Sequence, residues 1–525
     1  MNPAGTEPPE MRPPTLGASA RASVLWGGGS TLVRDFVQFA TMLVLVRLLS
    51  PTDYGSMALA QTVVGLLSVV SFGTLVMHAL QLRDPDDVDW QGHFTAALAV
   101  NFVLFVLTLG VALLLSRAEH FSAAAFPLAL LSLVFLVEIP ATLRHRMLQV
   151  AHDWKRFRLL ILAGTVLGAV AGVTVAALGG GVMALAIQPV LFGLPGAIDL
   201  LFVVRWRPDW SWSWPSYRET AIFGANRIGS GVMGNVRQAS EQALLAGTYD
   251  FAALGVFTRS VGLANLIAGR VGSVTSQALY PVVTRAAPRS VQFRRFSALI
   301  LRGVAWITIP AAILLAIEAT DVVAVLYGPK WVTVAPLLPL ACASVALAGI
   351  SATAYYLLMA NEELRLCLAL DICTAIAAVG LALWLIPYGP AAYLIALSTL
   401  AAVVLVATLA LLVQTGGIEV STILKSLLPP VMACAMAIAA VWLLRRGLSA
   451  LFPTSIDATS TSLPTLTLQF GRLLPESFVF TGTYALALNL CAPAALVEIL
   501  DVMPGRQYLR KLLPLTRSKA VSGEG

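Results

Sequence analysis

The chain has 525 residues, of which 58% are hydrophobic and only 12% are charged, and its formal net charge is +7. Soluble domains carry about 25% charged residues, so this composition excludes an ordinary soluble protein and favours one that crosses a membrane many times. The apolar stretches are about 20 residues long and uniform, which predicts membrane helices rather than the alternating strands of a barrel. The positive charge lies mainly in short loops, where it sets orientation, so no nucleic-acid partner is expected.

The predicted elements begin after residues 1–20, which are rich in proline and small residues and lack the apolar core of a signal peptide. We expect these residues to form a disordered cytoplasmic tail. About 14 membrane helices follow, and the expected spans are 23–47, 56–80, 94–115, 123–143, 157–178, 182–204, 221–245, 253–279, 297–317, 332–358, 366–386, 391–413, 423–443 and 477–500. The one long loop expected is 444–476.

Basic residues gather on one side of the predicted membrane. They occupy the N-terminal tail, the loops 144–158, 205–220 and 280–296, and the C-terminal tail, whereas the opposite side carries few, among them Lys330 and Arg472. Because cytoplasmic loops are enriched in lysine and arginine, this bias predicts that both termini lie in the cytoplasm.

The chain also contains an internal repeat with a shift of 200 residues. The matching pairs are Ser30 and Ser230, Gln38 and Gln238, Leu45 and Leu245, Gly55 and Gly255, and Leu66 and Leu266. Both copies begin in the cytoplasm, so they are parallel and predict two six-helix bundles around a central cavity. The bundles would be residues 21–215 and 216–414, while residues 415–525 would add two helices, the outer loop and a basic tail.

Polar and arginine residues form stripes along three of the predicted helices. A charge at mid-membrane costs about 2.5–3.5 kcal/mol on insertion scales, so such stripes should face a watery cavity rather than lipid. Arginine offers a planar fork of donors suited to phosphate, which predicts an anionic, phosphate-bearing substrate. The candidate binding residues are Arg34 and Gln38 in the first helix, Arg227, Arg237 and Gln238 in the seventh, and Arg259 and Arg270 in the eighth.

The same residues have simpler structural interpretations. Arg237 and Glu241 are four residues apart and could neutralise each other. Asp35 follows Arg34 in sequence and is expected to point to another part of the helix surface and to pair with another helix. Glu138, Asp199 and Asp371 could bind a coupling proton or cation, although paired structural carboxylates are commoner.

Motifs for other activities are missing from the sequence. There is no phosphate-binding loop of the form GxxxxGK[ST] and no GxSxG nucleophile turn. The five cysteines and five histidines show no metal-ligand spacing. We therefore expect a transporter rather than an enzyme, without a metal or another cofactor.

Four segments resemble one known family. They are VRLLSPTDYGSMALAQTVVGLLSVVSFG at 46–73, RHRMLQVAHDWKRFRLL at 144–160, LYPVVTRAAPRSVQFRRF at 279–296 and LYGPKWVTVAPLLPL at 326–340. In this order they are similar to the Wzx-type polysaccharide exporters of the multidrug/oligosaccharidyl-lipid/polysaccharide (MOP) superfamily, and the matches extend over about residues 20–415.

This resemblance implies a flippase in the bacterial inner membrane. It would move a polyprenyl-diphosphate-linked oligosaccharide by alternating access, for exopolysaccharide, capsule or O-antigen synthesis. Its expected partners are the lipid-linked oligosaccharide, membrane lipid and, further along, a polysaccharide polymerase and export machinery. One alternative is a peptidoglycan-precursor flippase. A second is a multidrug or cation antiporter, for which an acid-dominated cavity is expected. A third is a membrane enzyme of polysaccharide assembly, for which reactive groups on the outer loops are expected.

Overall fold

The computed structural model describes residues 16–71, 88–208, 234–266, 287–448 and 463–493, together with residues 283, 495, 496 and 498. All regular secondary structure in these ranges is helical, and nine of the described helices are long and apolar enough to cross a membrane. A further apolar helix, α10 (Phe251–Ala264), is shorter. The predicted all-α, multi-pass membrane fold is confirmed.

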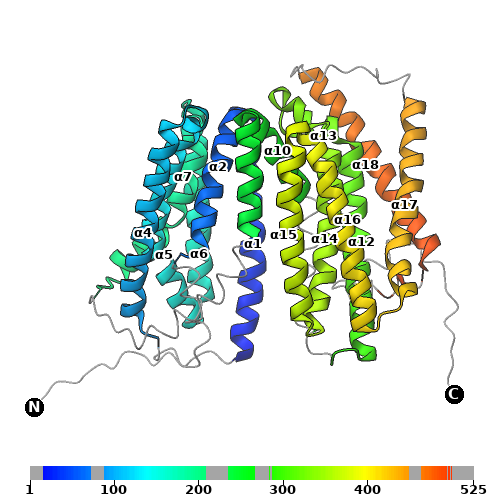
Figure 1. Ribbon diagram of the computed structural model, residues 1–525, viewed down its shortest axis with the longest axis horizontal. Helices are drawn as coiled ribbons and strands as arrows, with labels where there is room; N and C mark the ends of the chain where they lie inside the picture. The colour runs from blue at the N-terminus through cyan, green and yellow to red at the C-terminus, as the bar shows by residue number, and fades with distance from the viewer. Residues whose placement is uncertain are drawn as a thin grey trace, which may run out of the picture. The chain divides into compact units, whose positions relative to one another are not determined.

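The chain divides into two compact units, residues 1–239 and 240–525. The described helices of the first unit are α1 (Leu16–Leu48), α2 (Pro51–Ser68), α4 (Trp90–Arg117), η3 (Glu119–Ala124), α5 (Ala125–Val150), α6 (Trp154–Ala177), α7 (Met183–Phe192), α8 (Leu194–Ile198) and the π-helical η4 (Asp199–Val203). Within this unit α4 packs along α5, and α6 packs between α1 and α7 (Figure 1). The division falls inside the helix formed by residues 234–248.

The second unit contains the end of that helix, α10, α12 (Val291–Ile317), α13 (Ala319–Leu326), η6 (Pro329–Val334), α14 (Leu338–Ala360), α15 (Leu364–Leu385), η7 (Ile386–Tyr388), α16 (Pro390–Gly416), α17 (Val420–Leu448) and α18 (Leu463–Cys491). The last two helices thus belong to the same compact unit as α12–α16. The subdivision of this part into a six-helix bundle and an added pair stays a prediction.

The predicted loop 444–476 is wrong at its C-terminal end. Helix α17 continues to Leu448, and α18 already begins at Leu463. The serine, threonine and proline content of this stretch favoured a loop, but Pro464 is the second residue of α18, where its missing N–H costs no helical hydrogen bond. Residues 449–462, between the two helices, lie outside the described residues.

Helix ends reproduce the repeat of 200 residues. Helix α1 ends at Leu48 and its counterpart at residue 248, while α2 begins at Pro51 and α10 at Phe251. Helices α2 and α10 are each capped by the residue that precedes them. The Ser50 hydroxyl accepts from the Asp53 N–H, and the Asp250 carboxylate accepts from the Ala253 N–H. In α2 the Asp53 side chain also accepts from the Ser50 N–H, which completes a capping box.

Helix α6 presents a row of glycines to α7. A Cβ atom at Gly164 would lie 2.1 Å from the carbonyl oxygen of Phe192, and one at Gly168 would lie 2.9 Å from that of Gln188. At Gly172 the nearest atom would be the carbonyl oxygen of Ala184, at 2.8 Å. The spacing of four residues is the small-residue pattern that lets membrane helices approach closely, so these glycines fix the distance between α6 and α7.

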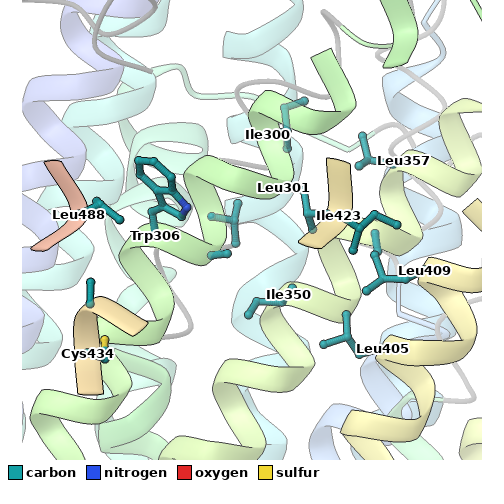
Figure 2. Packing of buried hydrophobic residues seen from close by; sticks show 14 of the residues in the cluster. Ile300, Leu301, Trp306, Ile350, Leu357, Leu405, Leu409, Ile423, Cys434 and Leu488 are labelled. Atoms are coloured by element: carbon teal, nitrogen blue, oxygen red, sulfur yellow. The ribbon is translucent and has the colours of Figure 1, made fainter. Parts of the chain in front are cut away.

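The core of the second unit joins its last two helices to α12. Figure 2 shows Trp306 of α12 beside Leu488 of α18, with Cys434 of α17 in the same cluster. The Trp306 indole donates to the Ser426 carbonyl oxygen at 3.0 Å, and the Tyr484 hydroxyl donates to the Trp306 carbonyl oxygen at 2.7 Å. Satisfied polar groups inside an apolar core specify one packing arrangement, so α17 and α18 are fixed parts of this unit.

Candidate functional site

A small cationic pocket lies between α1 and α6 in the first unit. It is lined by Ser30, Thr31, Arg34, Arg158, Ile161 and Leu162. Arg34 lies in the middle of α1, and Arg158 lies in the second turn of α6. Two hydroxyl-bearing residues and two arginines therefore line one pocket, whose other two lining residues are apolar.

The two arginines are held differently. Arg34 donates from Nε and Nη2 to Asp35 Oδ1 at 3.4 and 3.2 Å, and its side chain is 33% exposed. Arg158 stacks its guanidinium over the Phe157 ring at 5.4 Å, and its buried Nε atom has no hydrogen-bond partner. A guanidinium has five N–H donors, so neither contact exhausts the donors of either arginine.

The contact between Arg34 and Asp35 corrects the prediction that Asp35 points away from its neighbour. The side chains of adjacent helical residues start about 100° apart, but arginine is long enough to fold back along the helix surface. Asp35 therefore orients Arg34. Gln38, one turn further along α1, is exposed on the surface of this unit.

The described end of the predicted seventh helix carries Arg237, Gln238 and Glu241. Arg237 is half-buried and Gln238 is exposed, while Glu241 accepts a hydrogen bond from the Tyr393 hydroxyl of α16 at 3.0 Å. This hydrogen bond fixes the helix to α16, so the contact of Glu241 is explained without a coupling ion. Arg227, in the same predicted helix, lies outside the described residues.

Arg259 is half-buried in α10, and its guanidinium lies against Gly262, one turn along the same helix. The Tyr327 hydroxyl approaches the Arg259 carbonyl oxygen at 3.5 Å. Arg270 lies outside the described residues. The placing of Arg237, Arg259 and Arg270 around a common cavity therefore stays a prediction.

Glu138 and Asp371, two of the candidate coupling carboxylates, both have protein neighbours. Glu138 of α5 lies near Arg146, two turns further along the same helix. Asp371 of α15 is exposed on its unit and accepts from the Tyr355 hydroxyl of α14 at 2.7 Å. These contacts agree with the interpretation that both carboxylates are paired with protein groups. Their role in ion coupling stays a prediction. In the part of the chain that the structure describes, no group of His, Cys, Asp and Glu side chains is arranged to hold a metal ion.

Sequence reasoning missed a buried ion triad in the first unit. Asp199 accepts from Arg144 Nε through Oδ2 and from Arg156 Nη2 through Oδ1, the latter at 2.6 Å. The sequence pattern predicts a basic loop at Arg144 and Arg156, but the structure places them in α5 and α6. A lone aspartate near the end of a span, opposite a basic loop, was the signal that could have identified the triad. The sequence pattern also predicts the same loop at Arg158, so it does not identify this residue as part of the pocket.

The arrangement of helices is that of a known class of membrane transporter. The fold is similar to the lipid II flippase MurJ in an inward closed conformation, with a TM-score of 0.65 and 13% identity over 87% of this chain and 99% of that one. It is also similar to an inward-facing multidrug resistance MATE family transporter of the MOP superfamily, with a TM-score of 0.57 and 16% identity over 75% of this chain and 96% of that one. The chain therefore shares the fold of these two transporters.

Sequence comparison shows the family. Residues 44–336, more than half of the chain, match the polysaccharide biosynthesis protein family, and the chain belongs to it. The succinoglycan biosynthesis transport protein ExoT of Rhizobium meliloti (strain 1021) is 23% identical over 337 residues, which are 63% of this chain and 67% of that protein. An uncharacterized membrane protein in the cps region of Klebsiella pneumoniae is 20% identical over 358 residues, or 66% and 72% of the two chains.

Proposed function

We propose that the protein is a flippase that moves a polyprenyl-diphosphate-linked oligosaccharide across the bacterial inner membrane, with both of its termini in the cytoplasm. The observation that carries this proposal is the pocket in which α1 and α6 bring Arg34 and Arg158 together with Ser30 and Thr31. The family and the name of the relative from Rhizobium meliloti support a substrate from polysaccharide synthesis.

The chemistry of the pocket fits a diphosphate better than a cation. Guanidinium groups donate two parallel hydrogen bonds to phosphate oxygens, and hydroxyls donate one each. Arg34 and Arg158 supply the positive charge, and no carboxylate is among the lining residues of the pocket. Asp35 contacts Arg34 from the side and leaves other N–H groups of that side chain for an anion.

In this proposal, the remaining candidate residues complete a polar path for the headgroup. Arg237, Arg259, Gln38 and Gln238 would line it, together with Arg227 and Arg270 from outside the described residues. The two units would open to one side of the membrane and then to the other. The protein's partners would be the lipid-linked oligosaccharide, membrane lipid and the polymerase and export machinery that use the product, and it would act as a transporter without catalytic chemistry.

A peptidoglycan-precursor flippase is the second candidate, because the fold is similar to that of MurJ over 99% of the MurJ chain. At 13% identity this likeness shows the fold alone, and lipid II also carries a diphosphate. The two candidates therefore share the headgroup chemistry of the pocket and differ in the sugar. A drug or cation antiporter fits the pocket less well, since its positive charge would repel a cation.

The proposal is tested by charge removal in the pocket. We expect Arg34→Ala and Arg158→Ala each to reduce surface polysaccharide at least tenfold in a deletion strain complemented with each variant, because a charge-assisted hydrogen bond is worth about 1.5–3 kcal/mol. Lys155→Ala is the matched control, since it removes one exposed positive charge from the same helix. Undiminished polysaccharide in the Arg34 and Arg158 double variant would exclude the pocket as the headgroup site. Accumulation of a muropeptide-linked lipid in the deletion strain would favour the second candidate.

A further inference from the structure

A cluster of five charged side chains joins the last two helices to the end of α12. It contains Glu318, which directly follows α12, Asp321 of α13, Arg445 of α17, and Arg472 and Glu476 of α18. In the proposed topology this cluster lies at the outer surface of the membrane. We refer to these five residues as the outer ion cluster.

The two glutamates are the most deeply buried members of the outer ion cluster, with side chains that are each 1% exposed. Arg445 Nη2 bridges them, at 3.1 Å from Glu318 Oε1 and 2.6 Å from Glu476 Oε2. Arg472 Nε lies 3.0 Å from Glu476 Oε1 and 3.9 Å from Asp321 Oδ2. Both oxygens of Glu476 thus accept from an arginine, whereas only one oxygen of Glu318 does.

The charges of these five described residues do not balance. Three carboxylates face two guanidinium groups, which leaves one negative charge in excess when every group is ionised. Arg446, the next residue after Arg445, places its guanidinium 3.6 Å from the centre of the Trp442 ring. Guanidinium groups do not release a proton in proteins, so within these five residues the balance can be reached only by protonating a carboxylate.

One atom in the outer ion cluster indicates which carboxylate would be protonated. Oε2 of Glu318 is buried and has no hydrogen-bond partner. An ionised oxygen buried without a partner is costly, but a protonated carboxyl oxygen becomes a donor. The Glu476 carboxylate, which Arg445 Nη2 bridges to Glu318, is the neighbouring carboxylate that could share this proton.

We propose that Glu318 and Glu476 form a proton-binding site in which the two carboxyl groups share one proton, and that this proton holds α18 against α12 and α13. Asp321, Arg445 and Arg472 are the other charged groups that face the pair, and they set its charge balance. The proposal does not depend on the transported substrate.

The site has a defined pH dependence. Burial and the neighbouring Glu476 raise the pKa of Glu318 from 4.5 to about 8. Because the folded protein then holds a proton that the unfolded chain has already released, stability declines as pH rises from 4.5 through about 8. Above that range the excess negative charge remains in the cluster and weakens the contact of α18.

Infrared difference spectroscopy of the full-length protein in nanodiscs tests the site directly. Between pH 6.5 and 9.5 we expect wild-type protein to lose the carbonyl band of one protonated carboxyl group, with a midpoint near pH 8. The Glu318→Gln variant should lack this change, and its melting temperature should be insensitive to pH in the same range. Glu419→Gln, which removes an exposed carboxylate at the start of α17, is the control and should behave as wild type.

A second variant keeps the test informative if Glu318→Gln does not fold. Glu476→Gln removes the excess negative charge, so the carboxyl band should titrate at a lower pH than in wild type. The proposal would be overturned by a wild-type spectrum without a titrating carboxyl band, or by a band that persists unchanged in Glu318→Gln. An unchanged midpoint in Glu476→Gln would also exclude a shared proton.

Discussion

The ion triad of the first unit gives a stability prediction whose size follows from the structure. Asp199→Asn preserves the shape of the side chain but removes its negative charge. Among the described residues, Asp199 is the only acidic residue that forms an ion pair with Arg144. Arg144 has a side chain that is only 10% exposed. Leaving such a charge without its partner costs about 3–5 kcal/mol, so the variant should lose that much unfolding free energy.

A matched change at the third member of the triad should cost far less. The Arg156 side chain is 40% exposed, so its contact with Asp199 is screened by solvent. Exposed ion pairs contribute about 0–1 kcal/mol, which is the loss expected for Arg156→Ala. Replacing both buried partners, as in Asp199→Leu with Arg144→Met, should recover most of the stability because no buried charge is left.

These variants can be compared by titrating purified protein in mixed micelles with sodium dodecyl sulfate and following the loss of helical structure. The expected order of stability is wild type, Arg156→Ala, and then Asp199→Asn, with the double variant nearer to wild type than Asp199→Asn is. Equal losses in Asp199→Asn and Arg156→Ala would refute the reasoning from burial. A double variant less stable than Asp199→Asn would refute the role assigned to the unpaired arginine.

Two further predictions concern packing. Gly168→Leu should prevent α6 from approaching α7 and abolish folded protein in a fluorescence size-exclusion assay, whereas Gly110→Leu, at a position with no atom within 4 Å of the added Cβ, should be tolerated. Trp306→Ala should cost about 3–5 kcal/mol of unfolding free energy in the detergent titration, because it removes a buried aromatic ring from the core of the second unit. Trp442→Ala, whose ring is 50% exposed, is its control and should cost less.

The parts of the fold that depend on local sequence were predicted well. The helices that were expected to begin at residues 56 and 253 begin at Pro51 and Phe251, 200 residues apart as in the repeat, because Ser50 and Asp250 cap them. Helix α18 was placed too late, because its first turns are polar enough to resemble a loop. Apolar length identifies the spans, but it does not locate a helix that begins outside the apolar region.

The contacts of the candidate site were harder to predict, because they join residues far apart in the sequence. Arg34 was identified by its depth in an apolar helix, whereas Arg158 was assigned to a loop from the basic residues around it. Their meeting in one pocket depends on the packing of α1 against α6. The outer ion cluster likewise joins Glu318 to Arg445 across 127 residues, and no local pattern predicts such a pair.

The most direct test of the proposed function is lipid translocation by purified protein in proteoliposomes. The probe is the polyprenyl-diphosphate-linked oligosaccharide that we expect to accumulate in the deletion strain, and exposure of its sugar on each leaflet is measured with a membrane-impermeant lectin. The account predicts translocation by wild type and by Lys155→Ala, and at least a tenfold loss in Arg34→Ala and Arg158→Ala. Translocation by the arginine variants at the wild-type rate, or its absence in wild-type proteoliposomes that contain folded protein, would contradict it.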